Sequence, residues 1–276
     1  MKSVKRNALR IAATTVAFGV VGAGAVGLAG TASASTLEQT RTYVNENFPG
    51  SVQIQVTGLN NEGVTVGFWS SMNNASMTND NSGFVDVGGH FRNANFPTGT
   101  PATPPVDQLL GVNDSDIAVG FYTDANGNNH GYEYNVATTR FSSVVDPNAP
   151  SASLTAAAIN DHGDVAGIYT NPANGNTDGF LLSHGHFTDL SVPGSSSTMA
   201  LGVNNSDEVV GVFVPSSNAN ALDGFTWTPQ HGFRTVDDPH GIGTTTINGV
   251  NDFGQLVGFY VDANGNTDGF LATPQR

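Results

Sequence analysis

The chain has 276 residues, no cysteine and a formal net charge of -14, with 34 glycines and only 12% charged residues. An acidic surface repels phosphate groups, so it disfavours nucleic acid and anionic lipid as partners and favours partners that are neutral, cationic or bridged by metal. Without disulfide bonds the fold depends on its hydrophobic core alone, and a chain of this length can bury one.

Residues 1–34 have the features of a secretory signal peptide. A basic start is followed by the apolar segment 11–28 and by the cleavage pattern Ala32-Ser33-Ala34. A retained membrane anchor is the alternative, but the flanking residues fit a signal peptide better. We therefore expect cleavage before Ser35, secretion and no membrane insertion afterwards. The mature chain would keep five of the nine basic residues against 23 acids, a net charge of -18.

An internal repeat organises the rest of the chain. Residues 111–132 read GVNDSDIAVGFYTDANGNNHGY and residues 249–270 read GVNDFGQLVGFYVDANGNTDGF, with identity at 14 of 22 positions. Weaker copies begin at Gly58, Ala158 and Gly202. The asparagine of the motif recurs at a spacing of 44 to 53 residues, at Asn60, Asn113, Asn160, Asn204 and Asn251. Such a period is typical of repeat architectures.

The third copy predicts four short strands, at residues 154–160, 164–170, 178–183 and 186–192. Asn160 to Gly163 predicts a bulged turn, and Asn174-Gly175 predicts a two-residue hairpin loop. In the second and fourth copies Asp116 and Asp207 replace the turn glycine, and aspartate tolerates the left-handed conformation that the turn requires.

The repeat is circularly permuted within the chain. The fifth copy ends after its third strand, whereas residues 43–60 align without a gap on residues 187–204. The N-terminal segment therefore predicts a fourth strand that completes the last unit. We expect an all-β fold, a five-bladed β-propeller of four-stranded blades that forms one domain over residues 35–276. The longest and most variable loops fall on the face opposite the Asn-Asp turns, where we expect binding.

The pattern GxNDxGxxVGxY, followed by a DGF or HGY element and by a phenylalanine six residues before a proline, resembles the HAF repeat of probable extracellular repeat proteins of bacteria. It covers nearly all of the mature chain. The resemblance implies export and a repeated β fold, and it implies no catalytic residue and no ligand.

Two polar loops space their oxygen side chains alternately, as calcium loops do. An EF-hand loop places glycine sixth and glutamate twelfth, whereas here glycine is fourth and the glutamate is missing. A solvated Asn-Gly turn is the alternative, and it is favoured over a calcium site. The candidate ligands are Asp124, Asn126, Asn128, Asp262, Asn264, Asn266 and Asp268.

Residues that break the repeat are candidates for a site that occurs once. Glu133 stands where other copies have Val85, Leu181, Thr226 and Leu271, so it is the candidate acid of a glycoside hydrolase, together with Asp107 or Asp86. A charge on a solvent-facing strand is the simpler interpretation. Among the aromatic residues, the candidates for stacking on a ligand are Trp69, Tyr134 and Trp227.

These observations favour a monomeric, secreted, non-enzymatic binding protein whose ligand is a neutral glycan or an extracellular protein. Its cofactor, if it has one, would be calcium. A carbohydrate-active enzyme that uses Glu133, and a structural surface protein without a discrete site, are the alternatives.

Overall fold

The computed structural model describes residues 47–72 and 80–274, and within them every regular element is a β-strand. This confirms the all-β prediction. The signal peptide predicted at 1–34 and the strand predicted around Tyr43 lie outside these residues. In the part of the chain that is described, no helix is long and apolar enough to cross a membrane.

In the described residues, nineteen strands form five consecutive antiparallel groups, which we name units one to five. Unit one contains β1 (Gln53–Leu59), β2 (Val64–Ser70), β3 (Ser82–Val87) and β4 (His90–Asn93). Unit two contains β5 (Asp107–Val112), β6 (Ile117–Thr123), β7 (Asn129–Asn135) and β8 (Arg140–Val144). Unit three contains β9 (Leu154–Ile159), β10 (Val165–Thr170), β11 (Thr177–Ser183) and β12 (His186–Leu190). Unit four contains β13 (Ser195–Val203), β14 (Val209–Pro215), β15 (Asp223–Thr228) and β16 (Gly232–Thr235). Unit five contains β17 (Thr246–Val250), β18 (Leu256–Val261) and β19 (Thr267–Ala272).

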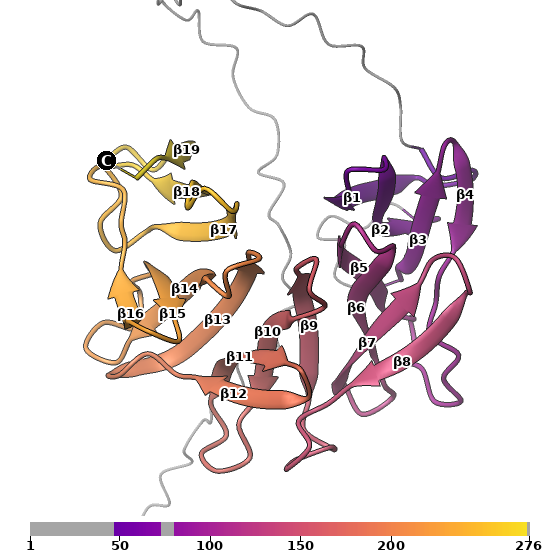
Figure 1. Cartoon of the computed structure of the whole chain (residues 1–276), viewed down its shortest axis with the longest axis horizontal. Helices are drawn as coiled ribbons and strands as arrows, with labels where there is room; N and C mark the ends of the chain where they lie inside the picture. Colours follow the sequence, from indigo (N-terminus) through magenta and orange to yellow (C-terminus); the bar gives the residue numbers. More distant parts are fainter. Residues whose placement is uncertain (1–46, 73–79, 275–276) are drawn as a thin grey trace, which may run out of the picture.

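The units stand side by side as an arc around a common axis, with units one and five at its two ends (Figure 1). Each unit is a meander in which consecutive strands pair. A single parallel bridge between Thr177 of β11 and Ser197 of β13 joins units three and four into one eight-stranded sheet.

The strands and turns of unit three confirm the sequence prediction with one correction. Gly163 has a φ of 87°, and Asp116 and Asp207 adopt the left-handed region at 57° and 58° in the equivalent turns. The Asn174-Gly175 loop is longer than the predicted two residues, because the Asn171 amide donates to the Asn176 carbonyl and encloses four residues. Gly175, at φ 76°, is the left-handed residue of this loop.

A β-bulge recurs in the first strand of every unit, as in the register shift between Val56 and Gly58 of β1. The bulge brings the first strand against the second. A Cβ atom on Gly67 would lie 1.9 Å from the Gln55 carbonyl oxygen, and glycine occupies the same place in the other units. The glycine at this position of the repeat is therefore a steric requirement.

Each pair of neighbouring units shares a core, in which a side chain from the second strand of one unit packs against the first strand of the next unit. All of these residues are fully buried. The pairs are Val66 with Leu109, Val119 with Ala156, Ala166 with Ala200, and Val210 with Ile247. Burying each larger aliphatic side chain contributes about 1.5–3 kcal/mol, so the interfaces between units carry much of the stability.

The innermost strands of all five units surround an axial cavity of about 370 Å³. At one end of this cavity the motif asparagines link the units. Asn60 Nδ2 donates to the Asn113 carbonyl at 3.1 Å, Asn113 Nδ2 to Asn160 at 2.9 Å, and Asn160 Nδ2 to Asn204 at 3.1 Å. Asn204 Nδ2 donates to the Asn251 carbonyl at 3.0 Å. The side-chain carbonyl of each asparagine caps its own turn, as Asn60 Oδ1 does for the Val64 amide. The recurring asparagine thus serves both the turn and the assembly.

Candidate functional site

A pocket of about 160 Å³ lies where units two, three and four meet, on the face opposite the Asn-Asp turns. It is formed by the start of β7, β9, β11 and β13 and by the end of β10 and β14, all at the same edge of their units. The lining residues are Asn129, Ser153, Thr155, Ile168, Tyr169, Thr170, Thr177, Ser197, Met199 and Val214. We name it the inter-unit pocket. It opens on the face where the sequence predicted binding.

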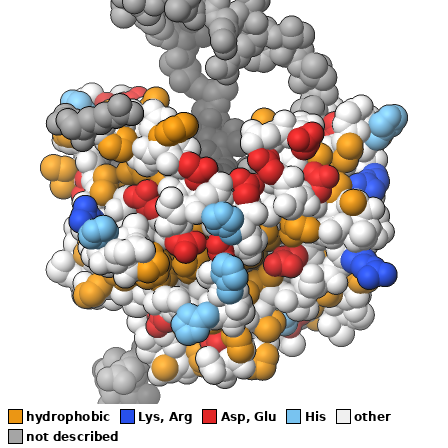
Figure 2. Space-filling view, viewed as in Figure 1, with side chains coloured by type: hydrophobic (Ala, Val, Ile, Leu, Met, Phe, Trp, Pro, Cys, Tyr) orange, Lys and Arg blue, Asp and Glu red, His pale blue; other side chains and the backbone are white. Residues whose placement is uncertain are grey.

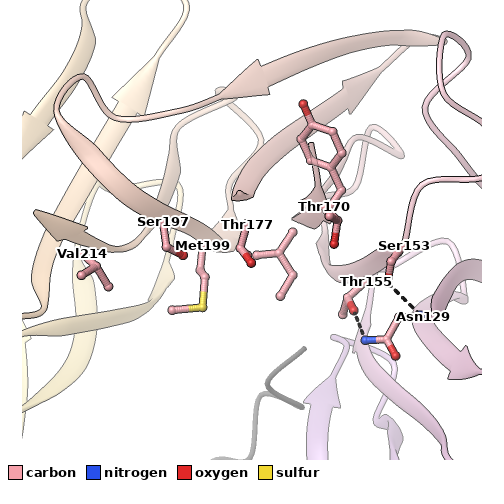
Figure 3. Close-up of a pocket in the computed structure, with 10 residues that line it drawn as sticks. Asn129, Ser153, Thr155, Thr170, Thr177, Ser197, Met199 and Val214 are labelled. Carbon is pink, nitrogen blue, oxygen red and sulfur yellow. Dashed lines mark hydrogen bonds between the residues drawn. The ribbon is translucent and has the colours of Figure 1, made fainter. Parts of the chain in front are cut away.

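The lining is uncharged and combines hydroxyl groups with aliphatic surface. Thr177, Ser197 and Met199 gather on one side, and Asn129, Ser153 and Thr155 on the other (Figure 3). Asn129 is held in place, because its backbone amide donates to Ser153 Oγ at 2.9 Å and its side-chain Nδ2 donates to Thr155 Oγ1 at 3.0 Å. Neutral hydrogen-bond donors and acceptors held beside apolar side chains can bind a neutral polar ligand.

Tyr169 connects the pocket to a group of acids behind it. Its ring is 5% exposed and contacts Phe187 edge-on at 5.1 Å. Burial, together with the nearby carboxylates of Asp189, Asp178 and Asp146, raises the pKa of Tyr169 above its usual range. The tyrosine therefore remains a neutral hydroxyl that donates a hydrogen bond to Asp189. Burial and the Asp178 charge in turn raise the pKa of Asp189, although the hydrogen bond from Tyr169 offsets part of this rise.

The axial mouth, which we define by the five Asn-Asp or Asn-Asn pairs of the turns, is a second polar hollow of about 230 Å³. The Asp114 amide donates to Asp161 Oδ1 at 2.9 Å, and the Asn205 amide donates to Asp252 Oδ1 at 2.8 Å. These carboxylates hold neighbouring turns together. In the described ranges no group of three or more His, Asp or Glu side chains is arranged to hold a metal ion.

The two candidate calcium loops direct the carboxylates of Asp124 and Asp262 inward. Asp124 Oδ1 accepts the amides of Asn126 and Asn128 at 2.8 and 2.9 Å, and Asp124 Oδ2 lies 3.0 Å from His130 Nε2. Burial acts to raise the pKa of Asp124, but the hydrogen bonds from His130 and the loop outweigh it and lower the pKa to about 2. In the same way, Asp262 accepts the backbone and side-chain amides of Asn264 and Asn266. Asp268, at the start of β19, is exposed. The Asn-Gly turns account for the contacts of Asp124 and Asp262, and calcium stays an untested alternative.

The three aromatic residues predicted to meet a ligand do not lie together. Trp69 is at the end of β2 on the face of the inter-unit pocket, where it stacks on Phe48 at 4.5 Å and donates from Nε1 to Asn93. Tyr134 pairs with Ala118 and Trp227 pairs with Val209, so both lie near the opposite face. Tyr134 is 3% exposed and belongs to the core. Its ring therefore has no surface free for a ligand.

The carboxylates proposed for glycoside hydrolysis are also separate. Glu133 lies in β7 and accepts a hydrogen bond from Ser142 Oγ at 3.3 Å. Asp107, in β5, is buried and accepts from Tyr132 Oη at 2.5 Å and from the Phe96 amide at 2.7 Å. Burial raises the pKa of Asp107 to about 7, against the effect of these two hydrogen bonds. Asp86 is buried in β3 of unit one. No hydrogen bond between described residues joins any two of these acids.

The sequence did not point to the residues that line the inter-unit pocket. Met199 stands where the other copies have Gln55, Gln108, Thr155 and Thr246. This divergence within the repeat was a usable signal, because it marks a position in each first strand whose side chain differs among the copies.

The surface agrees with the acidic composition. In the view along the axis, Asp and Glu side chains gather across the middle of the face, and the Lys and Arg side chains in sight lie at its edge (Figure 2).

No protein-family model matches the sequence, and no curated protein matches it. Solved structures do resemble the fold. A prolyl endopeptidase matches with a TM-score of 0.53 and 11% identity over 82% of this chain and 36% of that chain. The SapL1 lectin, solved in complex with alpha methyl fucoside, matches with a TM-score of 0.50 and 8% identity over 80% of this chain and 76% of that chain.

AofleA from Arthrobotrys oligospora matches with a TM-score of 0.48 and 13% identity over 76% of this chain. The chain spans 65% of AofleA and about a third of the endopeptidase, so it is shorter than both. At these identities the similarity concerns the fold alone. The chain is an all-β protein of the propeller type, similar in fold to a lectin and to part of a peptidase.

Proposed function

We propose that the chain is a secreted, five-bladed β-propeller that binds a neutral glycan in the inter-unit pocket. The observation that carries this proposal is the uncharged lining of a pocket in an otherwise acidic protein. Hydroxyl and amide groups on Thr155, Thr177, Ser197 and Asn129 line the pocket together with the apolar side chains of Ile168, Met199 and Val214. A sugar ring presents both hydroxyl groups and C–H surface, so it matches this combination.

The size of the pocket limits what it can enclose. Pockets that bury a drug-sized ligand have volumes of about 300–1,000 Å³. A volume of about 160 Å³ is smaller and suits one sugar ring, with the rest of a glycan outside. The fold similarity to the SapL1 lectin, solved with alpha methyl fucoside, supports a monosaccharide or terminal sugar as the ligand class.

A glycan array tests this proposal on the chain from Ser35 to Arg276, with calcium and with chelator in parallel. Selective binding to a terminal sugar is expected in both arms. Ser197→Trp should fill the pocket and weaken binding at least about tenfold, a loss of about 1.4 kcal/mol. Ser196→Trp is the matched control, because Ser196 is the exposed neighbour on the same strand and does not line the pocket.

The outcome that contradicts the proposal is absence of binding by a folded protein, or equal binding by the chain and its Ser197→Trp variant. Circular dichroism and thermal unfolding of each variant separate loss of binding from loss of fold. Equal weakening by both tryptophan variants would place the ligand elsewhere on this face.

A further inference from the structure

The two ends of the arc expose side chains whose counterparts are core residues in every other unit. Val257 of β18 is 47% exposed, whereas the equivalent residues Val66, Val119, Ala166 and Val210 are fully buried. Val56 of β1 is 45% exposed, whereas Leu109, Ala156, Ala200 and Ile247 are fully buried. These are the four pairs that form the core between consecutive units. Val257 and Val56 are therefore the two halves of a fifth pair.

The series of asparagine hydrogen bonds between units at the axial mouth is also interrupted between units five and one. Four asparagine side chains donate to the asparagine carbonyl of the next unit, from Asn60 through to Asn204. Asn251 Nδ2 instead donates to Gln255 Oε1 at 2.8 Å within its own turn. Among the described residues no hydrogen bond joins Asn251 to Asn60. The fifth donor and the first carbonyl of the series thus lie on opposite sides of the opening.

The chain entering unit one repeats the connection between units three and four. The Ser51 amide donates to the Phe48 carbonyl at 2.9 Å, as the Ser195 amide donates to Val192 at 3.0 Å. Gly50 and Gly194 have nearly equal φ angles of 86° and 83°. In the second case the residues before the turn are β12, the fourth strand of unit three. In the sequence, the residues before Phe48 stand in the same place as β12 does before Val192.

Unit five has the free edge that such a strand needs. Its described part contains three strands, and β19 pairs with β18 on one side. Leu271 of β19 is 64% exposed, whereas Leu181, its counterpart under β12, is 3% exposed. An exposed strand edge beside an apolar surface accepts a further strand.

We propose that residues 36–46 of the same chain add to the edge of β19 as the fourth strand of unit five, and that β1 then packs Val56 against Val257 and closes the ring. The register follows from unit three, where Thr188 is opposite Leu181. Val44 takes the place of Thr188 and lies opposite Leu271. The closed ring also brings Asn251 Nδ2 to the Asn60 carbonyl. The seam is an intramolecular strand-acceptor site, independent of the ligand in the inter-unit pocket.

A disulfide test uses the absence of cysteine from the natural chain. The double variant Val44→Cys with Leu271→Cys, made in the chain from Ser35 to Arg276, should form an intramolecular disulfide under mild oxidation and remain a monomer. Val44→Cys with Thr226→Cys is the control, because Thr226 is the equivalent position in unit four and pairs there with β16. A disulfide-linked dimer would show that a second copy fills the seam, and absence of any disulfide would show that the strand lies elsewhere. Either result overturns the proposal.

A substitution at the seam tests closure without cysteine. Val257→Asp should lower the Tm by about 6 °C or more, because it places a carboxylate in a core that forms only when the ring is closed. Val145→Asp is the matched control, since Val145 is exposed to a similar extent away from the seam. Equal Tm values for the two variants would mean that the arc stays open.

Discussion

Units two and three have the same strand topology, but they differ in the linker residue that lies beside the tyrosine of the second strand. In unit two Phe96, the residue before Pro97, stacks on Tyr122 at 4.8 Å and contacts Phe141 edge-on at 5.5 Å. In unit three the residue before Pro147 is Asp146, and the tyrosine equivalent to Tyr122 is Tyr169. Tyr169 has no aromatic side chain from the linker over it, and it lines the inter-unit pocket.

The comparison separates units one, two and four from units three and five, because Asp238 precedes Pro239 just as Asp146 precedes Pro147. Phe48 and Val192 occupy the same linker position for units one and four, and both are apolar. Phe48 stacks on Trp69, and Val192 belongs to the core cluster of Phe213. A single linker residue therefore decides whether the aromatic residue of the second strand is covered by apolar atoms or lies beside carboxylates.

The largest expected effect concerns the buried acid of unit two. The pKa of Asp107 is about 7 in the folded chain against an ordinary value of 3.8, so the folded state keeps a proton that the unfolded state has released. The free energy of unfolding should therefore fall by up to about 4 kcal/mol as the pH rises from about 4 to about 7, and should level off above that. Urea denaturation across this range measures the effect.

Other carboxylates contribute slopes of either sign, since the pKa of Asp124 is lowered and that of Asp189 is raised. The informative quantity is therefore the difference from Asp107→Asn. That variant should lack the decline, because an amide does not titrate. If the two curves run parallel, Asp107 is ionised in the folded state and its burial is less complete than the structure shows.

The next effect compares the two linker residues directly. Phe96→Ala removes a ring that contacts Tyr122, Tyr132 and Phe141, and should lower the free energy of unfolding by about 2 kcal/mol. Asp146→Ala should cost about 1 kcal/mol or less, since it removes mainly the hydrogen bond to the Asn148 amide. Chemical denaturation of both variants gives the comparison. Equal losses would mean that the linker packs alike in the two units.

A smaller effect is expected at the tyrosine beside the pocket. Tyr169→Phe removes the hydrogen bond that lowers the pKa of Asp189, so this pKa should rise further. Stability should change by about 1 kcal/mol. Carbon NMR titration of the aspartate side chains measures the pKa. Tyr122→Phe in unit two is the control and should leave Asp189 unchanged; a shift in both variants would indicate a change in the whole sheet.

The smallest effect is expected in the polar loops. Asp124→Ala removes the acceptor of the Asn126 and Asn128 amides at an exposed turn, and should lower the free energy of unfolding by about 1 kcal/mol or less. Because the carboxylate oxygens already accept hydrogen bonds within the loop, addition of calcium should leave the Tm unchanged. A rise in Tm with calcium that disappears in Asp124→Ala would establish a metal site there.

Strand positions and turns could be predicted from the sequence, because they depend on contacts between residues of the same repeat. The glycine in Val-Gly-Phe lies against the bulge of the preceding strand, and the asparagine side chain caps the turn that follows it. Five copies of the same pattern made these requirements visible. The length of the Asn174-Gly175 loop was predicted wrongly, because the dipeptide marks only the left-handed residue of a longer loop.

The candidate site followed less well from the sequence, because its residues are far apart along the chain. Ser153, Thr177 and Ser197 are ordinary strand residues until three units bring them to one opening. For the aromatic residues, the sequence instead suggested a ligand contact that the structure does not support. Tyr134 was a candidate for ligand contact, yet its ring fills the core between units one and two.

The sequence by itself determined that the chain is all-β, where its strands begin and end, and which residues form its turns, because these depend on contacts within one repeat. Only the tertiary structure decided which repeats adjoin at a pocket and which acids are buried. It also showed that the core positions of the first and last units face an opening. Those properties depend on which side chain of one unit meets which side chain of the next, and a pattern that repeats along the chain does not encode that choice.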